Sequence, residues 1–294
     1  MDESRSCPMA NRLLVLFLLI GLCACSRPQK VLQPPARVAA DATLSLAQSL
    51  ELKQRWQDAI QTYRSAASQY EAFGEIRGQV YAYAGLARIA YQNAESEDFD
   101  SYREQIRLLI ELGDPPSQYI ADLLDIYLLE SQGDYAGILR IAEDSYEYPL
   151  HIRMQMLSHR LQSESYLNPG YTSTSYSDLQ RLSNRYRRLL KKDFSADPTV
   201  LANANYAMAY YNYLHRQYNE ALRRIDAAID LDYRYENFGG LGSAYWLRGK
   251  IREAIGEPTL ALHDYVKAKH IFNHYQDPEM QKQVESAITR LQGD

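Results

Sequence analysis

The chain has 294 residues and a formal net charge of −5, from 32 Lys and Arg against 37 Asp and Glu. Its 46% hydrophobic and 23% charged residues are typical of a globular protein, which excludes a disordered polymer and a multi-span membrane protein. The mildly acidic charge argues against non-specific nucleic-acid binding, because such binding depends on an excess of basic residues. With 14 Gly and 11 Pro, the chain favours helices over a turn-rich β-sandwich.

Residues 1–24 are predicted to be a targeting segment rather than part of the fold. Arg12 precedes a predominantly apolar run over residues 13–22, and small residues follow that run. A basic residue, an apolar run of about 7–15 residues and a small-residue exit are typical of a secretory signal, and such a run is too short to span a bilayer. Met9 is a candidate start as well as Met1, because acidic residues lie between the two and suit the basic end of a signal badly.

The exit of this segment, Leu22-Cys23-Ala24-Cys25, resembles the lipobox of bacterial lipoproteins. The resemblance implies cleavage before Cys25, diacylation of its sulfur and acylation of its amine, so that three acyl chains anchor the protein in the cell envelope. Ser26 follows the cysteine, instead of the aspartate that tends to retain lipoproteins in the inner membrane of enteric bacteria, which favours the outer membrane. An ordinary cleaved signal and an uncleaved anchor stay open as alternatives.

The sequence after the signal is predicted to contain a tether and then a helical body. All three cysteines of the chain precede residue 26, so the mature body has no thiol to oxidise, which suits an oxidising periplasm. Residues 25–41 include three prolines and little periodicity. We interpret them as an extended tether with a reach of about 45 Å.

From residue 42 to residue 294 the sequence predicts amphipathic helices with short interruptions, and small residues recur among them at a fixed spacing. Offsets of 12 and then 7 positions define three sets: Ala47, Ala59 and Ala66; Ala209, Ala221 and Ala228; and Gly249, Ala261 and Ala268. A large residue lies four positions after the second member of each set, namely Tyr63, Ile225 and Tyr265. Antiparallel helices approach closely only where the facing side chains are small, so each set predicts a pair of packed helices.

These sets resemble the tetratricopeptide repeat, a helix-turn-helix unit of about 34 residues. The clear repeats lie near 43–73, 202–233 and 242–275, and the pattern between them is degenerate. The resemblance implies an all-α fold, a right-handed α-solenoid of antiparallel helix pairs like those of tetratricopeptide proteins. We expect about five pairs, one of them formed by helices over 150–167 and 177–192, and a capping helix over 278–291.

The sequence predicts neither an enzyme nor a metal or cofactor site. It has no Gly-rich phosphate loop, nucleophile elbow or paired-histidine metalloprotease motif. His263, His270 and His274 share a helix face, but no Asp, Glu or Cys completes a zinc ligand set, so we expect solvated histidines. A basic run over 181–192 is interpreted as a cationic helix end, with an anionic lipid or cell-wall partner as the alternative.

Tyrosine is the unusual component, with 25 residues against 6 Phe and 2 Trp. Spacings of 4 and 3 place Tyr206, Tyr210 and Tyr213 on one helix face, and the resemblance places them, with Asn205, Trp246 and Lys250, along a partner-binding groove. Tyrosine supplies a rigid apolar body and a polar tip, which suits an interface. Packing between helices is the alternative role. We expect at least one of the three tyrosines to be exposed and at least one to be buried.

The sequence thus favours a non-catalytic, lipid-anchored scaffold or adaptor of the bacterial cell envelope that binds a peptide or protein segment. By family analogy it would support outer-membrane protein insertion, pilus or secretion-system assembly, or control of cell-wall enzymes, and the fold alone does not choose among these. Two alternatives stay open: a glycan- or solute-binding lipoprotein whose tyrosines stack on sugar rings, and an envelope enzyme. The oligomeric state does not follow from the sequence.

Overall fold

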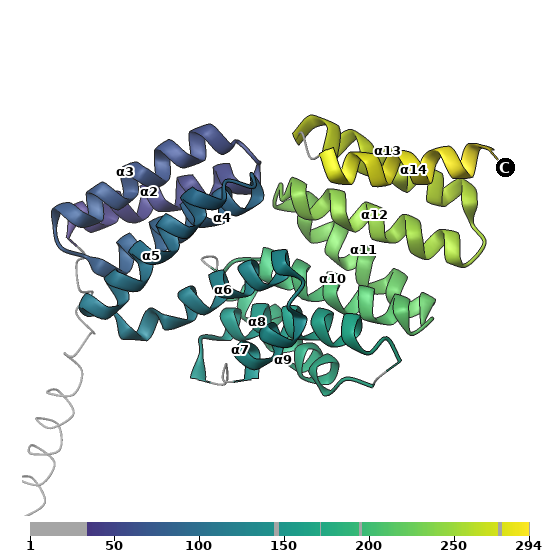
Figure 1. The fold of residues 1–294 in the computed structure, drawn as a ribbon, viewed down its shortest axis with the longest axis horizontal. Helices are drawn as coiled ribbons and strands as arrows, with labels where there is room; N and C mark the ends of the chain where they lie inside the picture. The colour runs from purple at the N-terminus through teal and green to yellow at the C-terminus, as the bar shows by residue number, and fades with distance from the viewer. Residues whose placement is uncertain (1–33, 144–146, 171, 194–195, 276–277, 294) are drawn as a thin grey trace, which may run out of the picture. The chain divides into compact units, whose positions relative to one another are not determined.

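A computed structural model describes residues 34–143, 147–170, 172–193, 196–275 and 278–293. The predicted signal, the lipobox with Cys25 and the first part of the tether lie outside the described residues. The described part of the chain contains thirteen α-helices and no strand (Figure 1). This confirms the predicted fold class, an all-α solenoid of paired helices.

Successive helices pack as antiparallel pairs along the chain (Figure 1). The first three pairs are α2 (Pro35–Leu52) with α3 (Trp56–Ala72), α4 (Ile76–Gln92) with α5 (Ser96–Gly113), and α6 (Gln118–Gln132) with α7 (Tyr135–Glu143). The next three are α8 (Leu150–Leu167) with α9 (Thr174–Leu190), α10 (Thr199–Leu214) with α11 (Tyr218–Arg234), and α12 (Phe238–Ala254) with α13 (Pro258–Tyr275). The described residues therefore form six pairs, one more than expected, because the degenerate segment at 76–143 holds two pairs.

The last helix, α14 (Pro278–Gly293), covers α13 as the predicted cap. Val284 and Ala287 are buried against Tyr265, Ala268 and Phe272 of α13. The terminal repeat therefore does not leave this apolar face open to water.

The first described helix begins earlier than expected. Residues 35–41 belong to α2 and are not part of an extended tether. Pro35 is the first residue of the helix, where its missing N–H is not needed and its fixed φ suits a helix, so it begins the helix rather than interrupting it. Ala40 is already fully buried, and Asp41 accepts a hydrogen bond of 2.7 Å from the Tyr70 hydroxyl.

The small residues predicted to lie between packed helices are buried there. Eight alanines have no exposed surface: Ala47, Ala59, Ala66, Ala209, Ala221, Ala228, Ala261 and Ala268. Gly249 is buried as well, and a Cβ added to it would lie 2.4 Å from Cε1 of Tyr265. The three large residues that follow the second small residue of each set are also fully buried. The small residues and the large residues that follow them are therefore buried at the spacing on which the sequence prediction rests.

The turns between helices repeat one backbone geometry. A residue with positive φ ends seven of the described helices: Gln54, Gly74, Ala94, Gly133, Arg216, Glu236 and Gly256. The N–H of the next residue then bonds to the carbonyl five positions back, as in Glu75 to Tyr70 (3.0 Å) and Glu257 to Arg252 (2.9 Å). This is the Schellman arrangement, which satisfies carbonyls that the helix end would otherwise leave unpaired.

Candidate functional site

Four helices that begin successive pairs, α4, α6, α8 and α10, meet through a series of ring contacts, and α12 meets α10 through a cation–π contact. Tyr91 of α4 stacks on Tyr127 of α6 at 5.4 Å between centroids, and Tyr127 lies 5.7 Å from the His159 ring of α8. Tyr166, also on α8, lies 5.6 Å from Tyr210 of α10. We call the surface formed by these rings and by the side chains that extend it on α10 and α12 the aromatic face.

The predicted groove residues lie on the α10–α12 part of this face. Tyr206, Tyr210 and Tyr213 project from α10, and Trp246 and Lys250 project from α12. The Lys250 ammonium lies 5.6 Å from the Tyr213 ring centroid and 5.8 Å from the Trp246 ring centroid. The structure therefore brings three of the five predicted residues into one cation–π cluster.

All three tyrosines of α10 are half-buried, so the expected division into exposed and buried rings is wrong. Each ring packs against the buried apolar cluster that includes Ala221 and Ile225 of α11. Rings at spacings of 4 and 3 on one helix receive the same depth of cover from the neighbouring helix, because they lie on one line along it.

Burial changes the acid–base properties of this part of the face. It raises the pKa of Tyr206 to about 12, with the neighbouring Tyr166 adding to the shift, and it raises the pKa of Tyr210 and Tyr213 as well. Burial lowers the pKa of Lys250, and the carboxylate of Glu253 opposes that shift. The phenols are therefore neutral hydrogen-bonding groups at physiological pH.

Asn205, expected along the groove, and Glu253 of α12, near Lys250, are both engaged in contacts within the fold. Asn205 is buried and donates from Nδ2 to the carbonyl of Leu201 at 2.9 Å, one turn earlier in α10. The Asn205 side chain is therefore buried within the fold and is not exposed to a partner. Glu253 accepts from the Tyr265 hydroxyl at 2.8 Å and pairs with Arg290 of α14, so it joins the cap to α12 and α13.

The sequence analysis missed two tyrosines that extend the aromatic face. Tyr135 of α7 stacks on Tyr166 with ring centroids 4.6 Å apart and planes 12° apart. Tyr166 is 51% exposed although it also contacts Tyr210. The sequence did contain one indication of the role of Tyr166. It lies seven residues after His159 in the helix predicted over 150–167, and this spacing places both side chains on one helix face.

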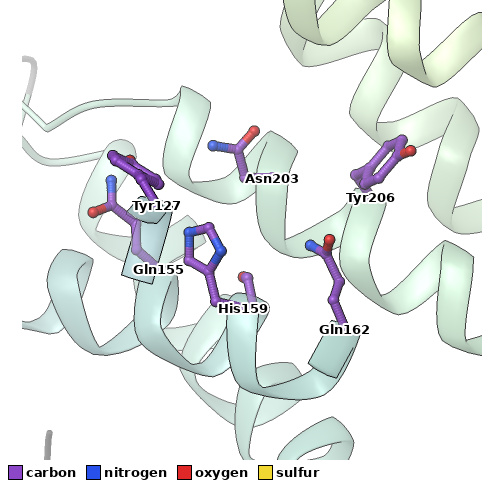
Figure 2. Close-up of a pocket in the computed structure, with 7 residues that line it drawn as sticks. Tyr127, Gln155, His159, Gln162, Asn203 and Tyr206 are labelled. Atoms are coloured by element: carbon purple, nitrogen blue, oxygen red, sulfur yellow. The ribbon is translucent and has the colours of Figure 1, made fainter. Parts of the chain in front are cut away.

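A polar cavity was also missed, between α6, α8 and α10 (Figure 2). It has a volume of about 250 Å³ and is lined by Tyr127, Gln155, Ser158, His159, Gln162, Asn203 and Tyr206. His159 Nδ1 lies 2.7 Å from a carboxylate oxygen of Glu130, which fixes the orientation of the imidazole. No predicted motif led to this cavity, because its side chains come from three helices whose packing the sequence alone does not determine.

The remaining candidate groups are on the surface. His263, His270 and His274 are exposed on α13, as expected for solvated histidines. No cluster of three or more potential metal ligands occurs within the described residues. In the basic run, Arg181 pairs with Asp178 at 2.7 Å and Arg187 bonds to Asn184, while Arg185, Arg188, Lys191 and Lys192 are exposed at the end of α9.

None of the helices in the described ranges is both long enough and apolar enough to cross a membrane. Comparison with known proteins adds no family to this description: neither protein-family models nor curated proteins match the chain.

Proposed function

We propose that this protein is a non-catalytic scaffold of the bacterial cell envelope, a lipoprotein of the tetratricopeptide type that holds a peptide or protein segment on its aromatic face. The observation that carries this proposal is the cluster of Tyr213, Trp246 and Lys250, with the half-buried Tyr206 and Tyr210 beside it. Half-buried rings are held rigidly by the core below them and still offer an edge to a partner, so binding costs little side-chain entropy.

The chemistry of the cluster suits a peptide segment with apolar and acidic side chains. The Lys250 ammonium is partly desolvated between two rings, so it has lost part of the stabilisation that water gives to a charge. An acidic group of the partner would replace that stabilisation by pairing with the ammonium. The rings of Tyr210 and Tyr213 would cover apolar side chains of the same segment. Envelope assembly by outer-membrane protein insertion, by pilus or secretion-system assembly, or by control of wall enzymes remains the proposed context.

In-cell photo-crosslinking tests the proposal at single positions. A photoreactive residue in place of Tyr210 should form crosslinks to a discrete partner protein. The same residue in place of Tyr233, which is 71% exposed on α11 and is not part of the aromatic face, is the control. Equal crosslinking at both positions would reject the face as the binding surface.

Alanine variants separate binding from packing. Tyr210→Ala and Tyr213→Ala should reduce recovery of the crosslinked partner by more than they reduce the folded fraction measured by circular dichroism. If recovery simply follows the folded fraction, the tyrosines serve packing and the proposed function is wrong. Tyr233→Ala should change neither measurement.

A further inference from the structure

The cavity between α6, α8 and α10 contains hydrogen-bonding groups that the fold itself does not use. Gln155 and Gln162 of α8 and Asn203 of α10 line it (Figure 2). Among the described residues, none of these three carboxamides has a hydrogen-bond partner. Each carboxamide offers two N–H donors and an acceptor oxygen, and Gln155 and Gln162 are half-buried while Asn203 is exposed, so the cavity presents donors and acceptors from two helices that are free to bind a ligand in place of water.

Two other side chains that line the cavity, His159 and Tyr127, are held in place by neighbouring residues. His159 is oriented by Glu130 through Nδ1, and when Nδ1 donates to that carboxylate the neutral ring keeps Nε2 as an acceptor. Tyr127 is held by stacking on Tyr91 and by the edge of His159. Such prearranged groups bind a ligand without a large ordering cost.

The lining has no charged side chain among its seven residues. Charged groups stand only behind the lining, where Glu130 holds His159 and Arg88 pairs with Glu51 near the Tyr127 phenol. An ionic ligand would therefore lose its hydration without gaining a charged partner from the lining itself, which is unfavourable. Two phenol rings, Tyr127 and Tyr206, enter the lining from different helices, and burial keeps both neutral by raising the pKa of each hydroxyl.

A sugar ring has the properties that this lining complements. It is uncharged, it carries hydroxyl donors and acceptors around its whole edge, and its C–H faces are apolar enough to lie on an aromatic ring. A peptide strand offers only one donor and one acceptor per residue along its main chain. The volume of about 250 Å³ corresponds to roughly eight water molecules at liquid density, so one ring with its hydroxyls can replace that water.

We infer that this cavity is a binding site for one uncharged pyranose ring, either as a free sugar or as a unit of a glycan. The carboxamides of Gln155, Gln162 and Asn203 would bond to the hydroxyls, His159 Nε2 would accept from one of them, and a tyrosine ring would cover a C–H face. The site shares Tyr127, His159 and Tyr206 with the aromatic face but contains none of Tyr213, Trp246 and Lys250, so sugar binding and the proposed peptide binding are tested at different residues.

Ligand-detected saturation-transfer NMR on the full mature chain tests the inference. The probes are glucose and N-acetylglucosamine, their β-1,4-linked disaccharides, and glucuronic acid as the charged counterpart of glucose. We expect saturation transfer to the uncharged sugars and at least tenfold weaker binding of glucuronic acid. Stronger binding of the disaccharides indicates a glycan as the source of the ring, and equal binding indicates a free sugar. Absence of transfer to every uncharged probe overturns the inference.

Variants place the binding in the cavity. The double variant Gln162→Ala with Asn203→Ala should weaken sugar binding at least tenfold, because it removes two neutral hydrogen-bonding side chains. Asn219→Ala, at an exposed asparagine of α11, is the matched control and should bind as the parent chain does. Unchanged binding in the double variant, with its helical circular dichroism retained, also overturns the inference. Tyr213→Ala should leave sugar binding intact, so the failure of peptide binding and the failure of this site are distinguishable.

Discussion

Single residues decide how closely the helices of this protein can approach. Where Gly249 faces the ring of Tyr265, there is no space for even one added carbon. The same contact occurs twice more, at Gly78 with Tyr70 and at Gly85 with Tyr63. The three glycines therefore allow the helices to approach closely, and the tyrosine rings fill the space that the missing side chains leave.

Enlarging a small residue between packed helices should destabilise the protein. Ala221→Leu and Ala261→Leu are each expected to cost about 1–3 kcal/mol, because both sites are fully buried and a larger side chain forces the helices apart. Urea unfolding of each variant checks this. Gly293→Ala, where a Cβ meets no atom within 4 Å, is the control and should be close to neutral. Neutral behaviour of both leucine variants would mean that the repeat register is misplaced.

One buried carboxyl should make stability depend on pH. Asp232, near the end of α11, is 3% exposed, and burial raises its pKa from 3.8 to about 7, against the opposing effect of a hydrogen bond from Asn237. Between pH 4 and pH 7 the unfolded chain has lost this proton and the folded chain still holds it. The contribution of Asp232 to the free energy of unfolding therefore falls as pH rises through that window and is level above it.

The variant Asp232→Asn should remove this loss. We expect it to match the parent chain near pH 3 and to exceed its stability by about 2–4 kcal/mol at pH 8. Thermal or urea unfolding at several pH values measures the difference. Asp230→Asn changes an exposed carboxylate of the same helix and should keep the slope of the parent chain. A difference in stability between the variant and the parent chain that stays the same from pH 3 to pH 8 would contradict the prediction.

At the scale of helices and turns, the recurring element is the helix end with one left-handed residue. The positions 54, 74 and 94, and again 216, 236 and 256, are twenty residues apart, so a helix and its turn repeat as one unit. Glycine occupies Gly74 and Gly256, while Gln54, Ala94, Arg216 and Glu236 adopt the same conformation with a Cβ. These side chains carry a steric cost that glycine avoids.

Exchanging the residue at this position should therefore change stability in opposite directions at two sites. Ala94→Gly, at φ 58°, should stabilise the protein by about 0.5–1 kcal/mol, and Gly74→Ala, at φ 73°, should destabilise it by about 1 kcal/mol. Melting curves of the pair give the answer, and each variant serves as the other's control. A shift of the same sign in both would show that the turn conformation is not the cause.

The sequence predicted the helices best where the small residues recur. Trp56, Tyr218 and Pro258 each begin a helix, and Leu150–Leu167 was predicted at its exact bounds. The number of pairs was underestimated, because Ile126 and Ile138 stand at buried positions where the repeat has small residues, so spacing alone gave no register there. The cavity escaped prediction for a related reason. Its lining side chains come from three helices, α6, α8 and α10, and the sequence carries no signal for which turns of those helices become neighbours.

At the scale of the whole molecule, residues 26–294 contain no cysteine, and Cys25 is the residue proposed to carry the lipid anchor. Cys25→Ser should abolish acylation and move the protein from the membrane fraction to the soluble fraction. Fractionation and intact mass spectrometry check both effects. As a related measurement, the body released from its N-terminal segment should not react with maleimide even when unfolded. Membrane partition that is unchanged in the variant, with no acyl mass on the parent chain, would end the lipoprotein proposal.

The shortest helix has a mechanical consequence. Helix α7 has nine described residues and ends at Glu143, where the described part of the chain is interrupted, whereas the other described α-helices contain 15 to 18. If a bound partner pulls on the protein while its N-terminus is anchored, every helix pair between the two points carries the same force. The pair whose helices share the smallest packing contact then separates first. That pair is α6–α7, and α6 also supplies Tyr127 to the polar cavity. We therefore expect tension to widen the cavity before it disturbs the three regular repeats, so that load on the envelope and occupancy of the cavity influence each other.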